Sequence, residues 1–112
     1  MASEVPGSAS VRAPRLSERQ RRHLRGLAHP LKPIIRLGAA GLTPAIERET
    51  SRALEDHELI KVRAPHGDRA SREELFAALA TRTASVLVQR VGHIAVLYRP
   101  NRELPRIMIP DP

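Results

Sequence analysis

The stretch IIRLGAAGLTP, residues 34–44, places a short apolar run before two glycines three residues apart and a helix start after them. The β-branched run IIRL (34–37) predicts a buried strand. Thr43 is a favourable N-cap, and Pro44 suits the first position of a helix. The stretch therefore predicts a strand, a glycine loop and a helix in succession.

A basic helix is predicted before this stretch, in LSERQRRHLRGLAH (16–29). It begins with a capping box between Ser17 and Gln20, and the prolines at positions 30 and 33 end it. One face of the helix is apolar, which leaves the arginines on the face exposed to solvent. The residues expected on the apolar face are Leu16, Leu24, Leu27 and Ala28.

Two further helices follow the glycine loop. The first runs from Pro44 to about Asp56, and the second begins with a capping box between Ser71 and Glu74. Apolar residues at helical spacing mark the face that each helix buries. They are Ile46, Thr50, Ala53 and Leu54 in the first, and Leu75, Phe76, Leu79 and Ala80 in the second.

Three strands complete the chain. ELIKVRA (58–64) alternates, with Ile60, Val62 and Ala64 on one side and Lys61 and Arg63 on the other. SVLVQRV (85–91) and HIAVLYR (93–99) form a hairpin at Gly92-His93. The order α-β-α-β-α-β-β predicts an α/β fold of the two-layer α+β kind, with a four-stranded mixed sheet packed by helices.

Composition and length indicate one domain and exclude several protein classes. The chain has 112 residues and no cysteine, which rules out a disulfide scaffold and a cysteine nucleophile. No apolar run approaches the roughly 20 residues of a membrane span, and MASEVPGSAS lacks the core of a secretory signal. We expect a disordered basic tail at 1–15, one domain at 16–100, a proline-rich extension at 101–112 and a cytoplasmic location.

The basic charge is unevenly distributed along the chain. Residues 1–36 carry eight basic and two acidic side chains, a net charge of +6, whereas residues 37–112 carry eleven and ten, a net charge of +1. This asymmetry indicates a polyanionic partner. A preference for arginine over lysine in the whole chain is the alternative, but it does not explain the clustering.

The glycine loop has the sequence context of an anion-binding site. A strand that enters a glycine loop at a helix start brings unpaired backbone N–H groups and the helix dipole to one place. Ala39 and Ala40 carry no charge, so any phosphate contact would use the backbone and the neighbouring Arg36. A tight turn that only needs positive φ is the alternative. If the loop binds the polyanionic partner, Gly41→Asp is expected to weaken that binding with little loss of fold.

The sequence contains no recognisable catalytic site. The loop lacks the Lys-Ser/Thr pair of a P-loop and the third glycine of a dinucleotide motif, so no nucleotide cofactor is expected. The five histidines do not have metal-ligand spacing, and no nucleophile lies near a base. We therefore expect a protein that is not an enzyme and needs neither a metal nor a small-molecule substrate.

Aromatic content distinguishes between modes of nucleic-acid binding. Phe76 and Tyr98 are the chain's aromatic residues. Phe76 falls on an apolar helix face, and Tyr98 offers at most one surface for stacking a base. Contact with phosphates and with the shape of folded RNA is therefore favoured over base stacking.

Three segments carry a family resemblance: LSERQRRHLRGLAHPLKPIIRLGAAGLT (16–43), ALEDHELIKVR (53–63) and VGHIAVLYRP (91–100). They resemble the bacterial YhbY family of small RNA-binding proteins with one CRM domain (chloroplast RNA splicing and ribosome maturation). The resemblance implies a fold similar to the C-terminal domain of bacterial translation initiation factor three. It also implies binding of structured RNA, with the loop on the RNA-facing surface, and association with precursors of the large ribosomal subunit.

The expected interface combines this loop with basic side chains, and a monomer is expected. The RNA-binding residues are Gly38, Ala39, Ala40, Gly41, Arg21, Arg22, Arg25, Lys32, Arg36, Lys61 and Arg63. Two alternatives stay open. The chain could serve as an RNA chaperone or an intron- or messenger-RNA-binding factor, or its basic face could dock an acidic protein.

Overall fold

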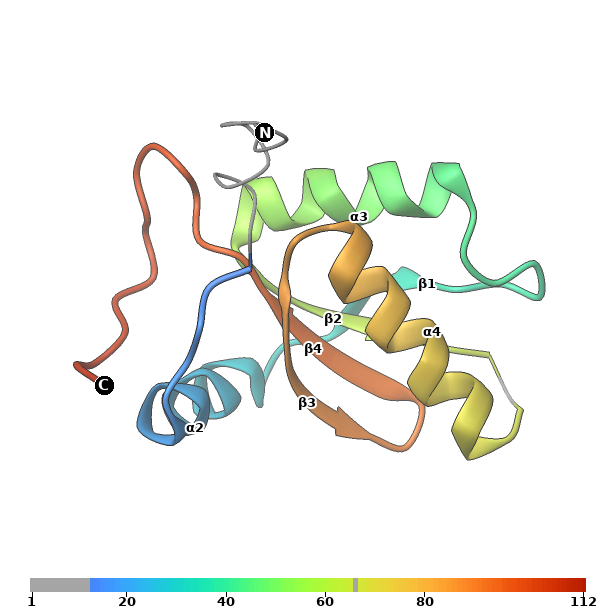
Figure 1. The fold of residues 1–112 in the computed structure, drawn as a ribbon, viewed down its shortest axis with the longest axis horizontal. Coiled ribbons are helices and arrows are strands. Elements are labelled where there is room, and N and C mark those ends of the chain that lie inside the picture. Colours follow the sequence, from blue (N-terminus) through green and yellow to red (C-terminus); the bar gives the residue numbers. More distant parts are fainter. Residues whose placement is uncertain (1–12, 66) are drawn as a thin grey trace, which may run out of the picture.

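The computed structural model describes residues 13–65 and 67–112, which form three helices and one four-stranded sheet (Figure 1). The elements in chain order are α2 (Glu18–Ala28), β1 (Pro33–Arg36), α3 (Pro44–His57), β2 (Leu59–Arg63), α4 (Arg69–Arg82), β3 (Val86–Val91) and β4 (Ile94–Tyr98). The expected order and the mixed sheet are confirmed. Most of the tail expected at 1–15 lies outside the described residues.

The sheet has the strand order β1-β2-β4-β3. β1 and β2 are parallel, and β4 is antiparallel to both β2 and β3. β2 and β3 thus run in the same direction, but β4 lies between them. The tight turn expected at Gly92-His93 is confirmed, with Gly92 at φ +58°. The last strand of the chain therefore occupies a central place in the sheet.

Helices cover both faces of the sheet, so the sheet is a middle layer rather than one of two layers. We call the face under α3 and α4 the core face and the opposite face, beside α2, the open face. β4 explains this arrangement, because Ala95 and Leu97 are buried on the core face while Val96 and Tyr98 are buried on the open face. We call the buried cluster on the core face the first core and the cluster between the open face and α2 the second core. Phe76, on α4, is 1% exposed within the first core.

Of the three helix caps predicted from the sequence, two are confirmed and one is wrong. The capping box of Ser17 and Gln20 is present at α2, and Thr43 accepts the N–H of Ile46 at the start of α3. α4, however, begins before Ser71, because Asp68 is its N-cap and accepts the N–H of Ser71 at 2.8 Å. An aspartate competes well for this position, so the helix starts three residues earlier than a Ser71 cap would allow.

Two burial predictions near the first strand are also wrong. Leu27 is 42% exposed, because the buried stripe of α2 follows Gln20, Leu24 and Ala28 at intervals of four residues. β1 is an edge strand, so only one of its faces is covered: Ile35 is buried but Ile34 is 49% exposed.

The proline-rich C-terminal segment is fixed to the domain by Glu58, which is fully buried. Its carboxylate accepts backbone N–H groups from Asn101, Arg106 and Ile107. Burial raises the pKa of Glu58, but these three N–H groups and the charge of Arg106 outweigh it and hold the pKa below its usual value. Ile107 and Ile109 then pack against the second core, beside α2.

None of the described helices is long and apolar enough to span a membrane.

Candidate nucleic-acid interface

The glycine loop forms a tight turn at one edge of the molecule (Figure 1). The Gly41 N–H donates to the carbonyl of Gly38 at 2.9 Å, and Ala39 and Ala40 at the tip are exposed. Gly41 has φ +71°, whereas Gly38 does not have positive φ, and a Cβ there would meet nothing within 4 Å. One glycine is thus required by the backbone, while the other leaves open space beside the turn.

This difference revises the expectation for Gly41→Asp. Any side chain at Gly41 must adopt the left-handed conformation, and its Cβ would lie 3.4 Å from Leu75. The substitution would therefore perturb the fold as well as the loop surface. Gly38 is the position at which added bulk tests access to the loop without backbone strain.

A buried leucine and a partly buried leucine hold the two ends of the loop. Leu37 is 4% exposed, and its N–H donates to the carbonyl of Arg63 at the end of β2, at 2.8 Å. Leu42 packs against the first core from the other side of the turn. The loop is therefore short, anchored at both ends and presented by a rigid sheet edge.

Arg36 and Arg63 lie side by side next to this loop. They are partners in the register of the parallel strands β1 and β2, and both are exposed. With Leu37 and His93 they line a hollow of about 200 Å³. Neither arginine forms an ion pair or side-chain hydrogen bond with another described residue. Neighbouring like charges on a sheet are unfavourable, so a bound anion would stabilise this pair.

Lys61 extends the basic surface from this arginine pair toward α2. It lies two residues before Arg63 on the same face of β2, about 7 Å along the strand. Its ammonium group donates to the carbonyl of His29 at the end of α2, at 3.2 Å, which places a positive charge at the negative end of the helix dipole. The prediction that Lys61 and Arg63 lie opposite Ile60 and Val62 is confirmed by their burial.

The α2 cations have different surroundings. Arg22 is exposed and forms no ion pair with the described part of the chain, whereas Arg25 is paired with Glu18 at 3.1 Å. Arg21 is half-buried, and its guanidinium donates to the carbonyl of Leu87 in β3 at 2.8 Å. Arg21 therefore has a structural role that its sequence position did not indicate. Lys32, just before β1, is exposed.

We call the surface formed by Arg22, Arg25, Lys61, Arg63 and Arg36 the basic track. It starts at α2, follows the open face along β2 and ends at the glycine loop. The structure thus brings most of the expected cations onto one face. Arg21 is turned toward β3.

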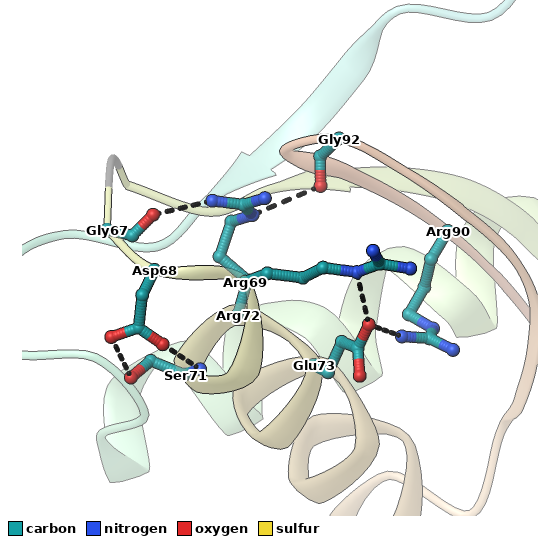
Figure 2. A network of polar contacts seen from close by, with 8 residues as sticks. All are labelled: Gly67, Asp68, Arg69, Ser71, Arg72, Glu73, Arg90 and Gly92. Atoms are coloured by element: carbon teal, nitrogen blue, oxygen red, sulfur yellow. Dashed lines mark hydrogen bonds and ion pairs between the residues drawn. The ribbon is translucent and has the colours of Figure 1, made fainter.

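A second group of arginines, absent from the sequence-based set, lies at the start of α4 (Figure 2). Glu73 accepts hydrogen bonds from Arg69 at 3.1 Å and Arg90 at 2.9 Å, which lowers its pKa below the usual value. Arg72 donates to the carbonyls of Gly67 and Gly92 and ties the hairpin turn to α4. The spacing of Arg69 and Glu73 is visible in the sequence, but Arg90 joins them only through the fold.

The remaining candidates for base or metal contact are excluded or unsupported. Phe76 and Tyr98 are 1% and 2% exposed, so neither ring offers a stacking surface. Burial accordingly raises the pKa of the Tyr98 hydroxyl. No group of three histidines or carboxylates with the geometry of a metal site occurs in residues 13–65 and 67–112.

Comparisons with known proteins give one family model and relatives named for RNA binding. The family model of the CRS1 / YhbY (CRM) domain matches residues 16–99. An RNA-binding protein of Haemophilus influenzae is 43% identical over 95 residues, covering 85% of this chain and 95% of that protein. A probable RNA-binding protein of Pseudomonas aeruginosa is 38% identical over 96 residues, covering 82% and 92%.

A solved structure gives the same result for the fold. The solution structure of a hypothetical Staphylococcus aureus protein, described as a candidate RNA-binding protein, matches with a TM-score of 0.75 and 35% sequence identity. The match covers 86% of this chain and all of that one.

Proposed function

Since the chain belongs to the CRS1 / YhbY (CRM) domain family, we propose that it binds structured RNA by contacting backbone phosphates. The observation that carries this proposal is the pair of exposed arginines, Arg36 and Arg63, beside the glycine loop. RNA phosphates would relieve the repulsion between these two side chains. The two relatives described above are named an RNA-binding protein and a probable RNA-binding protein, which supports the same class of ligand.

The contacts would come from charge and backbone rather than from aromatic stacking. The basic track offers several cations on one face, and the turn at Gly38 leaves room for a phosphate to approach the backbone. Neither Phe76 nor Tyr98 competes with this mode, because both side chains are buried. Affinity would therefore depend strongly on salt.

The physiological ligand in this proposal is ribosomal RNA in a precursor of the large ribosomal subunit, as the resemblance to the bacterial family implies. The protein would act in the cytoplasm as a monomeric assembly factor, without chemistry of its own.

Salt-dependent RNA binding tests the phosphate mechanism. For four to six phosphate contacts, log K is expected to fall with log salt with a slope of roughly −3 to −5. The double variant Arg36→Gln/Arg63→Gln should reduce the steepness of that slope by about 1.5 to 2. The matched control Arg48→Gln/Arg52→Gln removes the same charge from exposed positions of α3 and should retain more of the slope. Equal slopes for the two double variants would contradict the proposal.

Sedimentation of cell extracts tests the physiological ligand. The protein should co-migrate with large-subunit precursors and lose this association after ribonuclease treatment. Association that survives removal of RNA would instead indicate an acidic protein partner. Sequencing of crosslinked RNA separates ribosomal RNA from intron or messenger RNA.

A further inference from the structure

A groove of about 560 Å³ lies on the open face, between α2 and strands β3 and β4. We call it the α2 groove. Its aliphatic lining comes from the strands, through Val91, Ile94 and Val96. Basic side chains line it too: Arg22 and Arg25 from α2 and Lys61 from β2. Its volume is in the range of pockets that bind small organic groups.

Gly26 opens this groove at the helix. It lies inside α2, where a glycine costs about 1 kcal/mol relative to alanine. Neither of the usual structural reasons for glycine applies, because its φ is not positive and an added Cβ would meet nothing within 4 Å. What the missing side chain does provide is free space in the lining of the groove.

Gln89 supplies a polar group in the same groove. It lies in β3 and is partly buried, and its side-chain amide forms no hydrogen bond with another described residue. An amide side chain offers both donors and an acceptor, as the edges of nucleobases also do. The α2 groove thus combines an aliphatic surface, one amide without a partner and cations.

Resting on the proposed RNA-binding function, we infer that the α2 groove receives an unpaired nucleotide of a structured RNA. The base lies on Val91, Ile94 and Val96, with its edge toward Gln89. The flanking phosphates lie at Arg22 and Arg25.

Charge complementarity favours this occupant over an apolar helix or peptide. The cations that line the groove contact one carboxylate in the described chain, that of Glu18 at Arg25. A nucleotide matches both parts of the surface, because its base is flat and weakly polar and its phosphates are anionic. A continuous duplex would engage the cations but could not place a base on the aliphatic residues, since paired bases stay inside the helix.

Two RNA hairpins test the inference: one with a single unpaired uridine in its stem, and the same hairpin fully paired. The wild-type protein should bind the interrupted hairpin tighter, on the order of fivefold at fixed salt. Gly26→Leu places a side chain in the groove without changing the charge. This variant should lose the preference but keep its affinity for the paired hairpin.

Gly26→Ala is the matched control, because it adds one carbon and favours the helix. It should unfold at a higher denaturant concentration than wild type and retain most of the preference. Gln89→Leu removes the amide group but keeps a side chain of similar size. It should reduce the preference for the interrupted hairpin over the paired one. If Gly26→Leu fails to fold, Gln89→Leu and the wild-type comparison still decide the question.

Methyl NMR spectra locate the contact directly. The methyl signals of Val91, Ile94 and Val96 should shift on addition of the interrupted hairpin and shift less with the paired one. Equal wild-type affinity for the two hairpins, or a preference that persists in Gly26→Leu, would overturn the inference but leave the proposed function intact. Failure to bind either hairpin would overturn both. Methyl shifts produced by poly-glutamate but not by RNA would assign the groove to an acidic protein.

Discussion

The core face and the open face of the sheet are built from alternate residues of the same strands, yet they serve different purposes. Ile60 and Val62 of β2 are buried under α3 and α4, whereas Arg63, between Val62 and Ala64 in sequence, reaches solvent on the other side. α2 and the C-terminal segment cover only part of the open face. The uncovered part carries the strand cations of the basic track, Lys61, Arg63 and Arg36.

The two faces also differ in how their charges are paired. Among the described residues on the side of α3 and α4, Arg82 binds Glu47 at 2.8 Å, and Glu73 joins Arg69 and Arg90. On the open face, Arg36 and Arg63 have no such partners within the described chain. Internal pairing uses charges to hold elements together, while unpaired neighbouring charges remain available to a ligand.

The largest effect should come from the centre of the core face. Phe76→Ala is expected to lower the free energy of unfolding by about 3–5 kcal/mol, because it leaves a cavity in the first core. Val91→Ala, on the open face, should change it by less than about 0.5 kcal/mol, because Val91 is 63% exposed. Denaturant unfolding measures both values. Similar losses of unfolding free energy in the two variants would contradict the expectation that the core face contributes more to stability than the open face.

The next effect should come from Glu58, which fixes the C-terminal segment beside the open face. Glu58→Gln replaces one of the two carboxylate oxygens with an amide NH₂ group, which faces backbone N–H groups that need an acceptor. The change should lower the free energy of unfolding by about 1–3 kcal/mol at neutral pH. Because the folded pKa of Glu58 is lowered, its stabilising contribution is complete above the ordinary value of 4.5. It is lost as the pH falls through the folded pKa.

The stability difference between wild type and Glu58→Gln should therefore narrow as the solution is acidified below pH 4.5. Thermal unfolding across this range measures the difference, and faster amide exchange at Ile107 would show release of the segment. Glu49→Gln, an exposed change on α3, is the matched control and should not show this narrowing. A constant difference would exclude Glu58 as the titrating group.

The smallest effects on stability are expected at the two loop glycines, and they should differ between Gly41 and Gly38. Gly41→Val must adopt a left-handed conformation and should cost at least about 1–2 kcal/mol. Gly38→Val should change stability by less than about 0.5 kcal/mol, because its Cβ meets open space. Gly38→Val should nevertheless weaken RNA binding severalfold at fixed salt. Unchanged RNA affinity in Gly38→Val would show that this turn does not contact RNA.

The sequence by itself determined the ends of helices and strands wherever those ends depend on interactions between residues close in sequence. The capping box of Ser17 and Gln20, the Thr43 cap and the Gly92-His93 turn each depend on residues a few positions apart. Residue counts likewise located the charge excess in the first third of the chain. These features need no knowledge of which strand lies beside which.

Tertiary structure decided what depends on distant residues. The parallel pairing of β1 with β2 places Arg36 beside Arg63. The insertion of β4 between β2 and β3, together with the position of α2 on the open face, encloses the α2 groove. Strand order and helix placement are set by burial of both faces of the central strands. This is a property of the whole fold, and the hydrophobic periodicity within one element does not reveal it. The sequence therefore determined that the protein carries a basic surface and a glycine loop, and only the fold decided which cations face outward together.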